Sequence, residues 1–578
     1  MSYLPTDASD FASKAIDGFV AAHPRHVQRT DGGVIRLAPI PSGQVGVVVG
    51  GGSGHYPAFA GLVGRGLAAG AVCGNIFASP SAGQVLRVGS AVERGAGLLL
   101  SFGNYAGDVL HFTLGAERLQ RQGVDVRIVT VTDDIASAPI DQPELRRGIA
   151  GGLVVYKVAG AAAEAGLSLD EVERLARKAN GRTRSLGVAF SGCTLPGASQ
   201  PLFEVPSGRM AIGMGLHGEP GLSEGPLTDA ESLAALLVER LLAERPADLP
   251  EDQQRLVVLL NGLGSFKYEE LFVLFGAVNQ ELLARGVVLA DCECGELVTS
   301  LDMAGVSLSL CWLDAELEGF WSAPADSAAY RRGALSPIPA ADPAAELDSK
   351  QQTAVSKTAT QDSPEFTAAQ NALLARFEAV EKALEQRVEE LGALDAVAGD
   401  GDHGLGMLRG IRGARQSAIH ACTRGCSTGE VLMEAGEAWS DHGGGTSGAL
   451  WGGALLAAGN SIAQASEVGA KEIAAAFDAA LQAVVGLGQA APGDKTMVDA
   501  LQPYCLQLRS ELQAGVALDQ ALQNAAETCL VAAKATAEML PKLGRARPHG
   551  SRSLGHPDPG AMSLAYCLIA ATQVQPAT

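Results

Sequence analysis

The stretch between residues 323 and 363 limits the possible folds of this chain more than any other feature of the sequence. It is rich in Ala, Ser, Pro and polar residues, and it has neither a strand pattern nor a strong amphipathic period. Such a composition is typical of a linker. A chain of 578 residues is also too long for one ordinary core. We therefore expect one folding unit over residues 1–322 and a second over residues 364–578.

The first unit alternates apolar runs with helical patterns such as residues 167–180. Four of the apolar runs have the character of a buried strand that ends in a polar loop, at residues 43–55, 97–108, 125–134 and 255–265. Continuous apolar strands that alternate with helices predict an α/β architecture. In such folds, ligands bind at the carboxyl ends of the strands.

The second unit has a helical pattern throughout. Residues 366–400 carry apolar side chains at steps of three and four, and further Ala- and Leu-rich segments continue to the end of the chain. Glycine-rich loops separate these segments. The pattern predicts an all-α unit.

Charge and composition argue against several classes of protein. A net charge of −21 argues against a nucleic-acid-binding protein, because phosphate backbones require basic patches. The N-terminus lacks the basic start and apolar core of a signal peptide, and the longest apolar run, residues 447–461, is too short to span a bilayer. The ten scattered cysteines lack the spacing of a zinc site. We expect a cytoplasmic protein with reduced thiols that binds neither nucleic acid nor membranes.

The most acidic glycine-rich loop reads VAGDGDHGLGM at residues 397–407. It does not fit an EF-hand, because the third alternating position and the twelfth position lack a ligand. One interpretation is an acidic helix cap on a solvated loop. The alternative is that the glycines turn Asp400 and Asp402 toward one point, which Asp395 reaches from the preceding helix. Three such carboxylates would repel one another unless a hard cation such as Mg²⁺ neutralised them.

Three further glycine-rich loops precede helical segments of the second unit. Residues 440–452 open an apolar helix with backbone N–H groups and two hydroxyls, an arrangement that suits phosphate, although no Walker A lysine follows. Residues 486–501 offer Lys495 and Thr496 at another helix start. Residues 544–563 supply basic side chains and Asp558. Any one loop is compatible with ordinary helix capping, but four of them in one all-α unit favour a nucleotide–metal site.

In the first unit, two glycine loops each contain a histidine that we expect to be exposed. Residues 47–61 have the pattern of a strand, a glycine turn and a helix with His55 in the turn, and residues 213–218 match G-x-G-x-x-G with His217 inside. No helix promptly follows the second loop, so a dinucleotide site is not indicated. Asp108 stands at an expected strand end. A single loop histidine is usually structural, but two histidines and a carboxylate favour a pocket for a small polar molecule with acid–base chemistry.

Taken together, these motifs resemble those of single-chain dihydroxyacetone kinases. The resemblance covers essentially the whole chain in the order of the family. It rests on GGGSGHYPAFAG, NYAGD, GMGLHGEPG and TSLDMAG in the first unit and on GDGDHG, GGGTSGALWG, GDKTMVDAL and GHPDPGAMS in the second. It implies a substrate unit with two α/β subdomains and a nucleotide unit that forms a helical barrel.

The resemblance also implies a role for each substrate-site residue. His217 would hold a ketone covalently as a hemiaminal, which excludes polyols that lack a carbonyl. Asp108, assisted by His55, would accept the proton of the attacking terminal hydroxyl. The remaining substrate contacts would come from Gly52, Ser53 and Gly54.

For the second unit, the resemblance implies ATP as co-substrate and two Mg²⁺ ions bound by Asp395, Asp400 and Asp402. The residues expected to line the nucleotide site are Gly401, His403, Gly445, Thr446, Ser447, Lys495, Thr496, Met497, Asp558, Pro559 and Gly560. The partners implied are a small ketose or triose and ATP. The resemblance further implies a domain-swapped homodimer.

The expected activity is transfer of the γ-phosphate of ATP to a terminal hydroxyl of dihydroxyacetone. Many family members have a lysine before the NY pair and a threonine after it, where this chain has Gly103 and Ala106. Glyceraldehyde or a four-carbon ketose is therefore an alternative substrate. The lid loop GRARPHGSRS also departs from the family pattern.

Some relatives in this family have a different activity or none. One such activity is that of a lyase, which cyclises the ribityl-phosphate of FAD and releases AMP. Relatives of the first unit alone include ligand sensors without catalysis. The intact glycine loops and aspartates of the second unit argue against a sensor.

Overall fold

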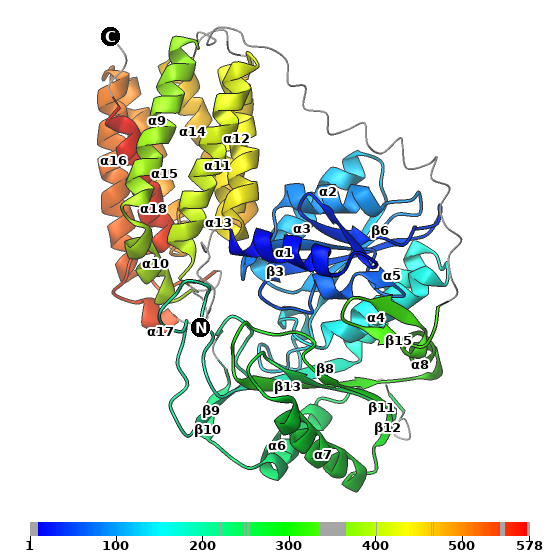
Figure 1. The fold of residues 1–578 in the computed structure, drawn as a ribbon. Coiled ribbons are helices and arrows are strands. Elements are labelled where there is room, and N and C mark those ends of the chain that lie inside the picture. The colour runs from blue at the N-terminus through cyan, green and yellow to red at the C-terminus, as the bar shows by residue number, and fades with distance from the viewer. Residues whose placement is uncertain are drawn as a thin grey trace.

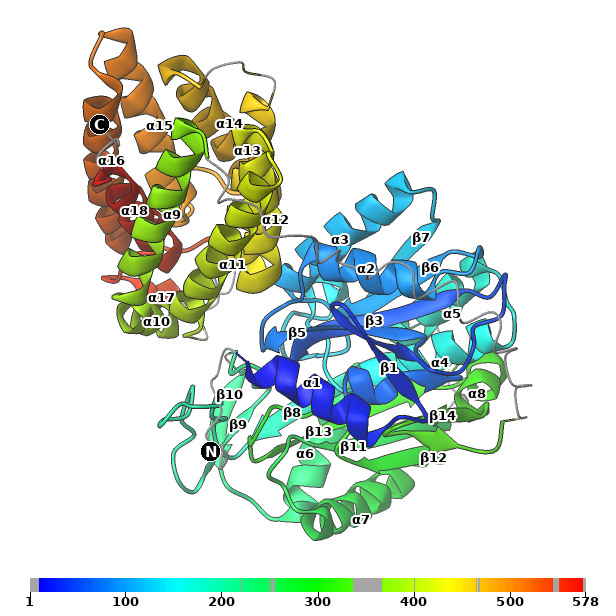
Figure 2. The same cartoon turned by 45° about the horizontal axis from the view of Figure 1, so that its top comes forward.

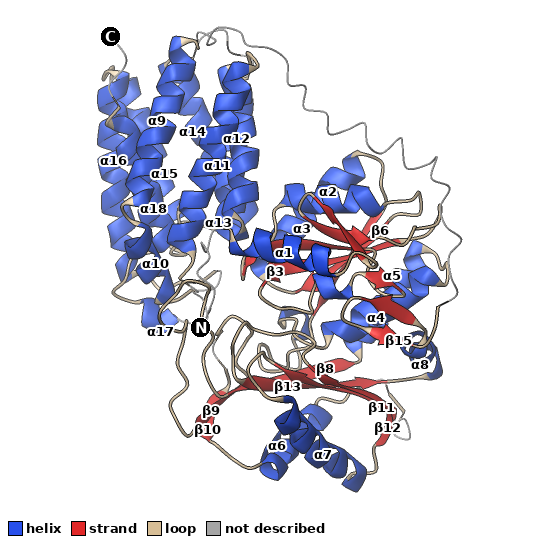
Figure 3. Cartoon of the chain, viewed as in Figure 1, coloured by secondary structure: helices blue, strands red, loops and turns tan. Residues whose placement is uncertain are grey.

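The chain forms two lobes that lie side by side (Figures 1 and 2). The first is a mixed α/β lobe, and the second consists of helices (Figure 3). In the computed structural model, the described residues are 10–219, 221–247, 249–250, 255–335, 366–399, 401–463, 465, 468–543 and 550–574.

The first subdomain of the α/β lobe is built on a six-stranded sheet. Its order is β1-β2-β5-β3-β6-β7, with β5, β3, β6 and β7 parallel and the first two strands antiparallel. Helices α2 and α3 pack on one face, and α4 and α5 cover the other. The strands are β1 Val27–Thr30, β2 Gly33–Arg36, β3 Gly46–Ser53, β5 Gly70–Ile76, β6 Leu98–Gly103 and β7 Val126–Val131. The helices are α1 Phe11–Ala22, α2 Ala82–Val92, α3 Ala106–Arg121, α4 Gly152–Glu164 and α5 Leu169–Gly181.

A second six-stranded sheet forms the other subdomain, in the order β10-β9-β8-β13-β11-β12. Its outer face is covered by α6 Ala230–Ala243 and α7 Tyr268–Ala284, and its inner face packs against α4 and α8 Ala315–Ser322. Helix α4 thus lies between the two sheets and is buried almost throughout. The strands are β8 Thr183–Ala189, β9 Arg209–Ile212, β10 Ser223–Pro226, β11 Arg255–Gly262, β12 Val288–Gly295 and β13 Gly305–Trp312. The expected pair of α/β subdomains is confirmed.

A short third sheet extends the α/β lobe beyond its expected end. Strand β14 Ala325–Ser327 pairs with β15 Arg331–Arg332 and with β4 Gly64–Arg65. The prediction places residues 325–332 in the linker at residues 323–363, because their sequence shows no strand pattern, and this part of the prediction is wrong. Their pairing partner β4 lies far away in the sequence, which explains why local composition does not indicate a strand. Residues 336–365, most of the rest of the expected linker, lie outside the described residues.

The second lobe is a ring of antiparallel helices, as expected for a helical barrel. Each long helix packs against the next, while α18 packs against α9 and α9 against α11 to complete the ring. In the described part of this lobe no strand occurs. The helices are α9 Ala368–Glu385, α10 Val388–Ala396, α11 His403–Thr423, α12 Thr428–Gly443, α13 Gly445–Ile462, α14 Ala470–Gly488, α15 Val498–Gln513, α16 Leu518–Ala535, α17 Gly550–Ser553 and α18 Pro559–Thr572.

The two lobes of the one chain contact each other directly. Helices α12 and α13 of the helical lobe pack against α2 and α3 of the α/β lobe. The domain-swapped homodimer expected from the sequence stays a prediction. Among the described residues, no helix combines the length and the apolar character needed to cross a membrane. All ten cysteines are free thiols, and six of them are buried.

The fit of α4 between the sheets depends on Gly160. A Cβ atom at this position would lie 2.3 Å from the carbonyl oxygen of Leu67 and 2.4 Å from its Cα. We predict that Gly160→Ala destabilises the α/β lobe by about 1–3 kcal/mol, because such overpacking forces the backbone to move. Thermal or denaturant unfolding of the purified chain would measure the change.

Gly276→Ala is the matched control for this prediction. Gly276 lies on α7, and nothing lies within 4 Å of an added Cβ. Alanine there should stabilise the lobe by about 0.5–1 kcal/mol through its higher helix propensity. Equal effects of the two substitutions would contradict the packing argument.

Candidate functional site

A pocket lies where the two subdomains of the α/β lobe meet, at the carboxyl ends of β3 and β6. His55, Asp108 and His217, which come from three distant segments, all line it. Gly52 lines the same pocket, but Ser53 and Gly54 do not: Ser53 donates from its Oγ to Gly74 O at 2.6 Å. The other lining residues include Phe77, Ser79, Gly103, Tyr105, Tyr156 and Leu216.

His55 is buried rather than exposed. Only 3% of its surface is accessible, and its ring stacks on Phe77 at a centroid distance of 5.0 Å. Its Nδ1 lies 2.8 Å from Thr299 O, which belongs to the second subdomain. Burial, with a further contribution from His217, lowers the pKa of His55 to about 3. The ring is therefore neutral at physiological pH.

The two histidines face each other, with His55 Nε2 and His217 Nε2 3.1 Å apart. Nδ1 of His217 lies 2.9 Å from Oε1 of Glu219, whose other oxygen accepts a hydrogen bond from the His217 backbone. A carboxylate and a carbonyl can only accept, so each Nδ1 carries the ring hydrogen. A neutral ring of this tautomer has its lone pair on Nε2, so the two Nε2 atoms form a hydrogen bond only when one of them also carries a hydrogen.

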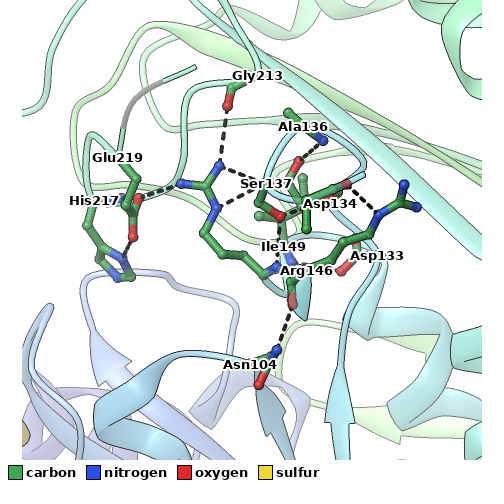
Figure 4. A network of polar contacts seen from close by, with 12 residues as sticks. Asn104, Asp133, Asp134, Ala136, Ser137, Arg146, Ile149, Gly213, His217 and Glu219 are labelled. Atoms are coloured by element: carbon green, nitrogen blue, oxygen red, sulfur yellow. Dashed lines mark hydrogen bonds and ion pairs between the residues drawn. The ribbon is translucent and has the colours of Figure 1, made fainter. Parts of the chain in front are cut away.

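Glu219 is itself held by charged groups. Arg147 lies 3.7 Å from Glu219 Oε2 and forms a 2.9 Å ion pair with Asp134, and Figure 4 shows this network around Asp134, Glu219 and His217. Burial lowers the pKa of Arg147, but the charges of Asp134 and Glu219 more than compensate, so the net shift is upward. The sequence motifs do not single out Glu219, Arg147 or Asp134 as site residues. The HGEPG motif contains Glu219, although its role depends on the distant arginine.

Asp108 lies in the first turn of α3 and not at a strand end as expected. It is buried, and the positive end of the helix favours a negative charge there. The preceding residue, Gly107, touches the other lobe: a Cβ atom at Gly107 would lie 3.5 Å from the backbone nitrogen of Thr446. The backbone next to Asp108 is therefore close to the loop that opens α13.

That loop, residues 443–447, is the expected phosphate cradle. Gly444 and Gly445 have φ angles of +64° and +58°, which favour glycine, and they turn the chain directly into the N-terminus of α13. Ser447 Oγ lies 3.2 Å from Nδ1 of His403, and Nε2 of His403 lies 2.9 Å from Ser563 Oγ. The starts of α11, α13 and α18 thus meet at one place and bring Thr446, Pro559 and Gly560 to the same end of the barrel.

Acidic side chains gather beside this loop. Asp395 has a buried carboxylate oxygen without a hydrogen-bond partner among the described residues, and Asp402 is close enough that its titration depends on the charge of Asp395. Burial, with a contribution from Asp395, raises the pKa of Asp402. The same two causes raise the pKa of Asp558, the N-cap of α18, to about 7. Buried carboxylates that disfavour one another's charge suit a divalent cation.

The structure describes two of the three residues expected to bind Mg²⁺. Asp400 lies outside the described residues, and the described residues contain no group of three or more side chains positioned to hold a metal ion. Asp395 and Asp402 are the two expected ligands that the structure places. Gly401, between them in the loop, has a φ of +75°.

Lys495 was expected to line the nucleotide site, but its amine makes other contacts. Lys495 is buried, and its Nζ donates to Ser553 O at 2.6 Å and to Met539 O at 3.2 Å. The amine thus fastens two neighbouring segments instead of pointing to a phosphate. Thr496 donates from its backbone to Asp499, and Met497 packs beside Gly560. Arg545 and Arg547 lie outside the described residues.

Comparisons with known proteins extend over the whole chain. The family model of the Dak1 domain matches residues 17–329, and that of the DAK2 domain matches residues 397–573. An L-erythrulose kinase from Pectobacterium atrosepticum is 50% identical over 575 residues, covering 99% of this chain and 96% of that protein. A D-erythrulose kinase from Mycolicibacterium smegmatis is 48% identical over 571 residues, covering 98% and 97%. The structure of the dihydroxyacetone kinase from C. freundii in complex with AMP-PNP and Mg²⁺ is 31% identical, covers 99% of both chains and has a TM-score of 0.52.

The burial of His55 leads to a prediction about its protonation. Because its pKa is lowered to about 3, its imidazole nitrogen resonances should not titrate between about pH 5 and pH 8, where an ordinary histidine does. Nitrogen-15 NMR of histidine-labelled protein would measure this, with His55→Gln to identify the peaks. A titration midpoint near the ordinary value of about 6.5 would contradict the assignment.

Proposed function

The chain belongs to the family of single-chain dihydroxyacetone kinases, and on that premise we propose that it is an ATP-dependent kinase for a four-carbon ketose. The observation that carries the proposal is the pairing, in one pocket, of His217 and Asp108 beside the loop of residues 443–447. His217 offers a lone pair suited to a carbonyl carbon, and Asp108 offers a base at the border of the second lobe.

The first step of the proposed reaction holds the ketose. Nε2 of His217 adds its lone pair to the carbonyl carbon, and the C=O π pair moves to the oxygen. The hydrogen on Nδ1 is passed to Glu219 and from there to solvent, and the oxygen takes up one proton from solvent, so the net product is a neutral hemiaminal with a hydroxyl group. His55 stays neutral, and its Nε2 can accept a hydrogen bond from that hydroxyl.

The second step transfers phosphate. Asp108 accepts the proton of the terminal hydroxyl while the oxygen attacks the γ-phosphorus of ATP, and the bond to the bridging oxygen of ADP breaks. The N-terminus of α13 supplies backbone N–H groups and a positive helix end for the phosphate oxygens. The covalent adduct fixes the ketose, so the reacting atoms meet with little loss of entropy in this step.

Asp395, Asp400 and Asp402 would hold Mg²⁺ in this proposal. The buried oxygen of Asp395 that lacks a hydrogen-bond partner among the described residues fits such a role. Bound to the carboxylates and the phosphates, the cation would neutralise their charges and align the triphosphate. The proposed co-substrate is therefore ATP, and the proposed cofactor is Mg²⁺.

Two observations favour a four-carbon acceptor over dihydroxyacetone. The relatives that are about half identical to this chain are named erythrulose kinases, whereas the dihydroxyacetone kinase structure is 31% identical. In addition, Gly103 lines the pocket in place of the lysine of many family members, which removes a cation from the pocket wall. The ring of Tyr105 takes the space beside Gly103, where a Cβ atom would lie 3.0 Å from Tyr105 Cε2, so the wall that faces the substrate differs from that of a lysine-containing relative. Because the two relatives are named for opposite enantiomers, the proposal leaves the enantiomer to experiment.

A phosphorylation screen tests this proposal. With ATP and Mg²⁺, we predict that one enantiomer of erythrulose gives a kcat/KM at least about tenfold above that of dihydroxyacetone, because a lost pocket contact costs this order of magnitude. Glyceraldehyde belongs in the same screen. Glycerol and erythritol should not react, since they have no carbonyl. His217→Ala should abolish the activity, and His420→Ala, an exposed change far along α11, should leave it intact.

The outcomes of the screen separate the candidate functions. A higher kcat/KM for dihydroxyacetone would overturn the four-carbon assignment and keep the kinase. If no ketose or aldose is phosphorylated, the kinase assignment itself fails. Incubation of FAD with Mn²⁺ in a parallel assay tests for lyase activity, with AMP release as the readout.

Asp108 gives a second, independent prediction. We expect Asp108→Asn to lower kcat by about 10²–10⁴-fold, the usual contribution of a general base. Formation of the hemiaminal should persist, because His217 and Glu219 are unchanged. A ketose labelled with carbon-13 at its carbonyl would report the adduct by NMR, while coupled ADP release reports kcat. A variant with nearly full kcat would remove Asp108 from the proposed mechanism.

A further inference from the structure

The contact between the lobes includes side chains that take no part in the proposed chemistry. The C-terminal end of α12 and the N-terminal end of α13 pack against α2 and α3. Both views of the fold show this junction (Figures 1 and 2). Two side chains, Asp441 on α12 and His111 on α3, make polar contacts that cross it.

Asp441 binds two groups of the α/β lobe. Ser81, the N-cap of α2, donates from its Oγ to one carboxylate oxygen, and Arg87 Nη2 donates to the other at 3.0 Å. Gly83 makes room for this approach, since a Cβ atom there would lie 2.7 Å from Asp441 Oδ1. The carboxylate is thus received by a hydroxyl, a guanidinium and the positive end of α2.

His111 binds the loop that opens α13. Its side chain is fully buried, and its Nε2 lies 2.7 Å from Gly445 O, which can only accept. Burial lowers the pKa of His111 to about 4, so the ring is neutral and donates from Nε2. The backbone nitrogen of the same residue, Gly445 N, donates to Ser79 O at 3.1 Å. The α/β lobe therefore holds Gly445 through both of its backbone polar groups.

Helix α3 connects this contact to the substrate pocket. Asp108 and His111 are three residues apart on it and lie on neighbouring positions of the same helix face. Asp108 faces the pocket, while His111 binds the loop of residues 443–447. The distance between the base and the phosphate loop is thereby fixed by one turn of a rigid helix.

We propose that His111 and Asp441 are positioning residues that hold the loop of residues 443–447 in register with Asp108, so that phosphoryl transfer requires the docked lobes. Neither residue lines the substrate pocket. The catalytic part of this inference rests on the proposed kinase function, whereas the docking part does not.

The proposal predicts a specific pattern of kinetic effects. A misplacement of the loop by about 1 Å should cost on the order of 10²-fold in kcat. In His111→Leu and Asp441→Arg we therefore expect kcat to fall about 10- to 100-fold, while KM values change little. The carbonyl adduct on His217 and the binding of a fluorescent ATP analogue with Mg²⁺ should also persist, because each ligand is bound within one lobe.

A charge exchange distinguishes positioning from general damage. Arg87→Asp combined with Asp441→Arg restores an ion pair across the junction and should recover a large part of the kcat that Asp441→Arg loses. His111→Gln, which keeps an N–H donor, should retain more activity than His111→Leu. Wild-type kcat in both single variants, or no recovery in the exchange, would overturn the proposal. So would parallel losses of adduct formation, nucleotide binding and thermal stability.

Small-angle X-ray scattering tests the docking without reference to activity. The Asp441→Arg variant should have a larger radius of gyration than the wild-type chain, and the charge exchange should reverse the increase. Unchanged scattering in Asp441→Arg would overturn the docking role. Failure of every sugar in the wild-type assay would instead count against the kinase function, so the two failures are distinguishable. If Asp441→Arg does not fold, Asp441→Asn and Arg87→Ala supply the same comparison.

Discussion

The first two turns of helix α3 are the constraint on which the arrangement of the site depends. Asp108 lines the substrate pocket, and His111 contacts the other lobe. Gly107 packs closely on Ser79, since a Cβ atom at Gly107 would lie 2.6 Å from Ser79 Oγ. Helix α3 follows β6 with only Asn104 and Tyr105 between them, and β6 is a central, fully buried strand. The position of Asp108 is thus inherited from the sheet, and the second lobe docks beside that fixed point.

The overall negative charge of the chain limits where it can bind an anion. With a net charge of −21, the protein repels anionic substrates overall and must neutralise them locally. In the α/β lobe, the single positive charge of Arg147 lies between Asp134 and Glu219 and offsets part of their negative charge beside His217. In the helical lobe, burial and the charge of Asp395 raise the pKa values of Asp402 and Asp558. In the proposed function, a phosphate-bound divalent ion would add positive charge beside these carboxylates.

The sequence predicted features that depend on local pattern and missed features that depend on distant contacts. Apolar runs predicted β3, β6, β7 and β11, because strands covered on both faces are continuously apolar. The predicted exposure of His55 is wrong, since its cover comes from Phe77 and from Thr299 in the other subdomain. Lys495 at a helix start suggested a phosphate ligand, yet its amine is bound by the carbonyls of Met539 and Ser553. No local pattern specifies such partners.

In the proposed function, the substrate pocket combines two filters of different physical origin. The lone pair of His217 selects for a carbonyl, because only a carbonyl carbon can form the covalent bond, and this filter discriminates without regard to chain length. The pocket wall at Gly103 and Tyr105 would discriminate among ketoses, and a difference of one carbon in a pocket is worth only about 1–3 kcal/mol. The first filter needs His217, Glu219 and Arg147 together, whereas the second changes with one side chain. A family built on the first can therefore diverge among three- and four-carbon ketoses while its histidine, acidic and glycine motifs stay the same.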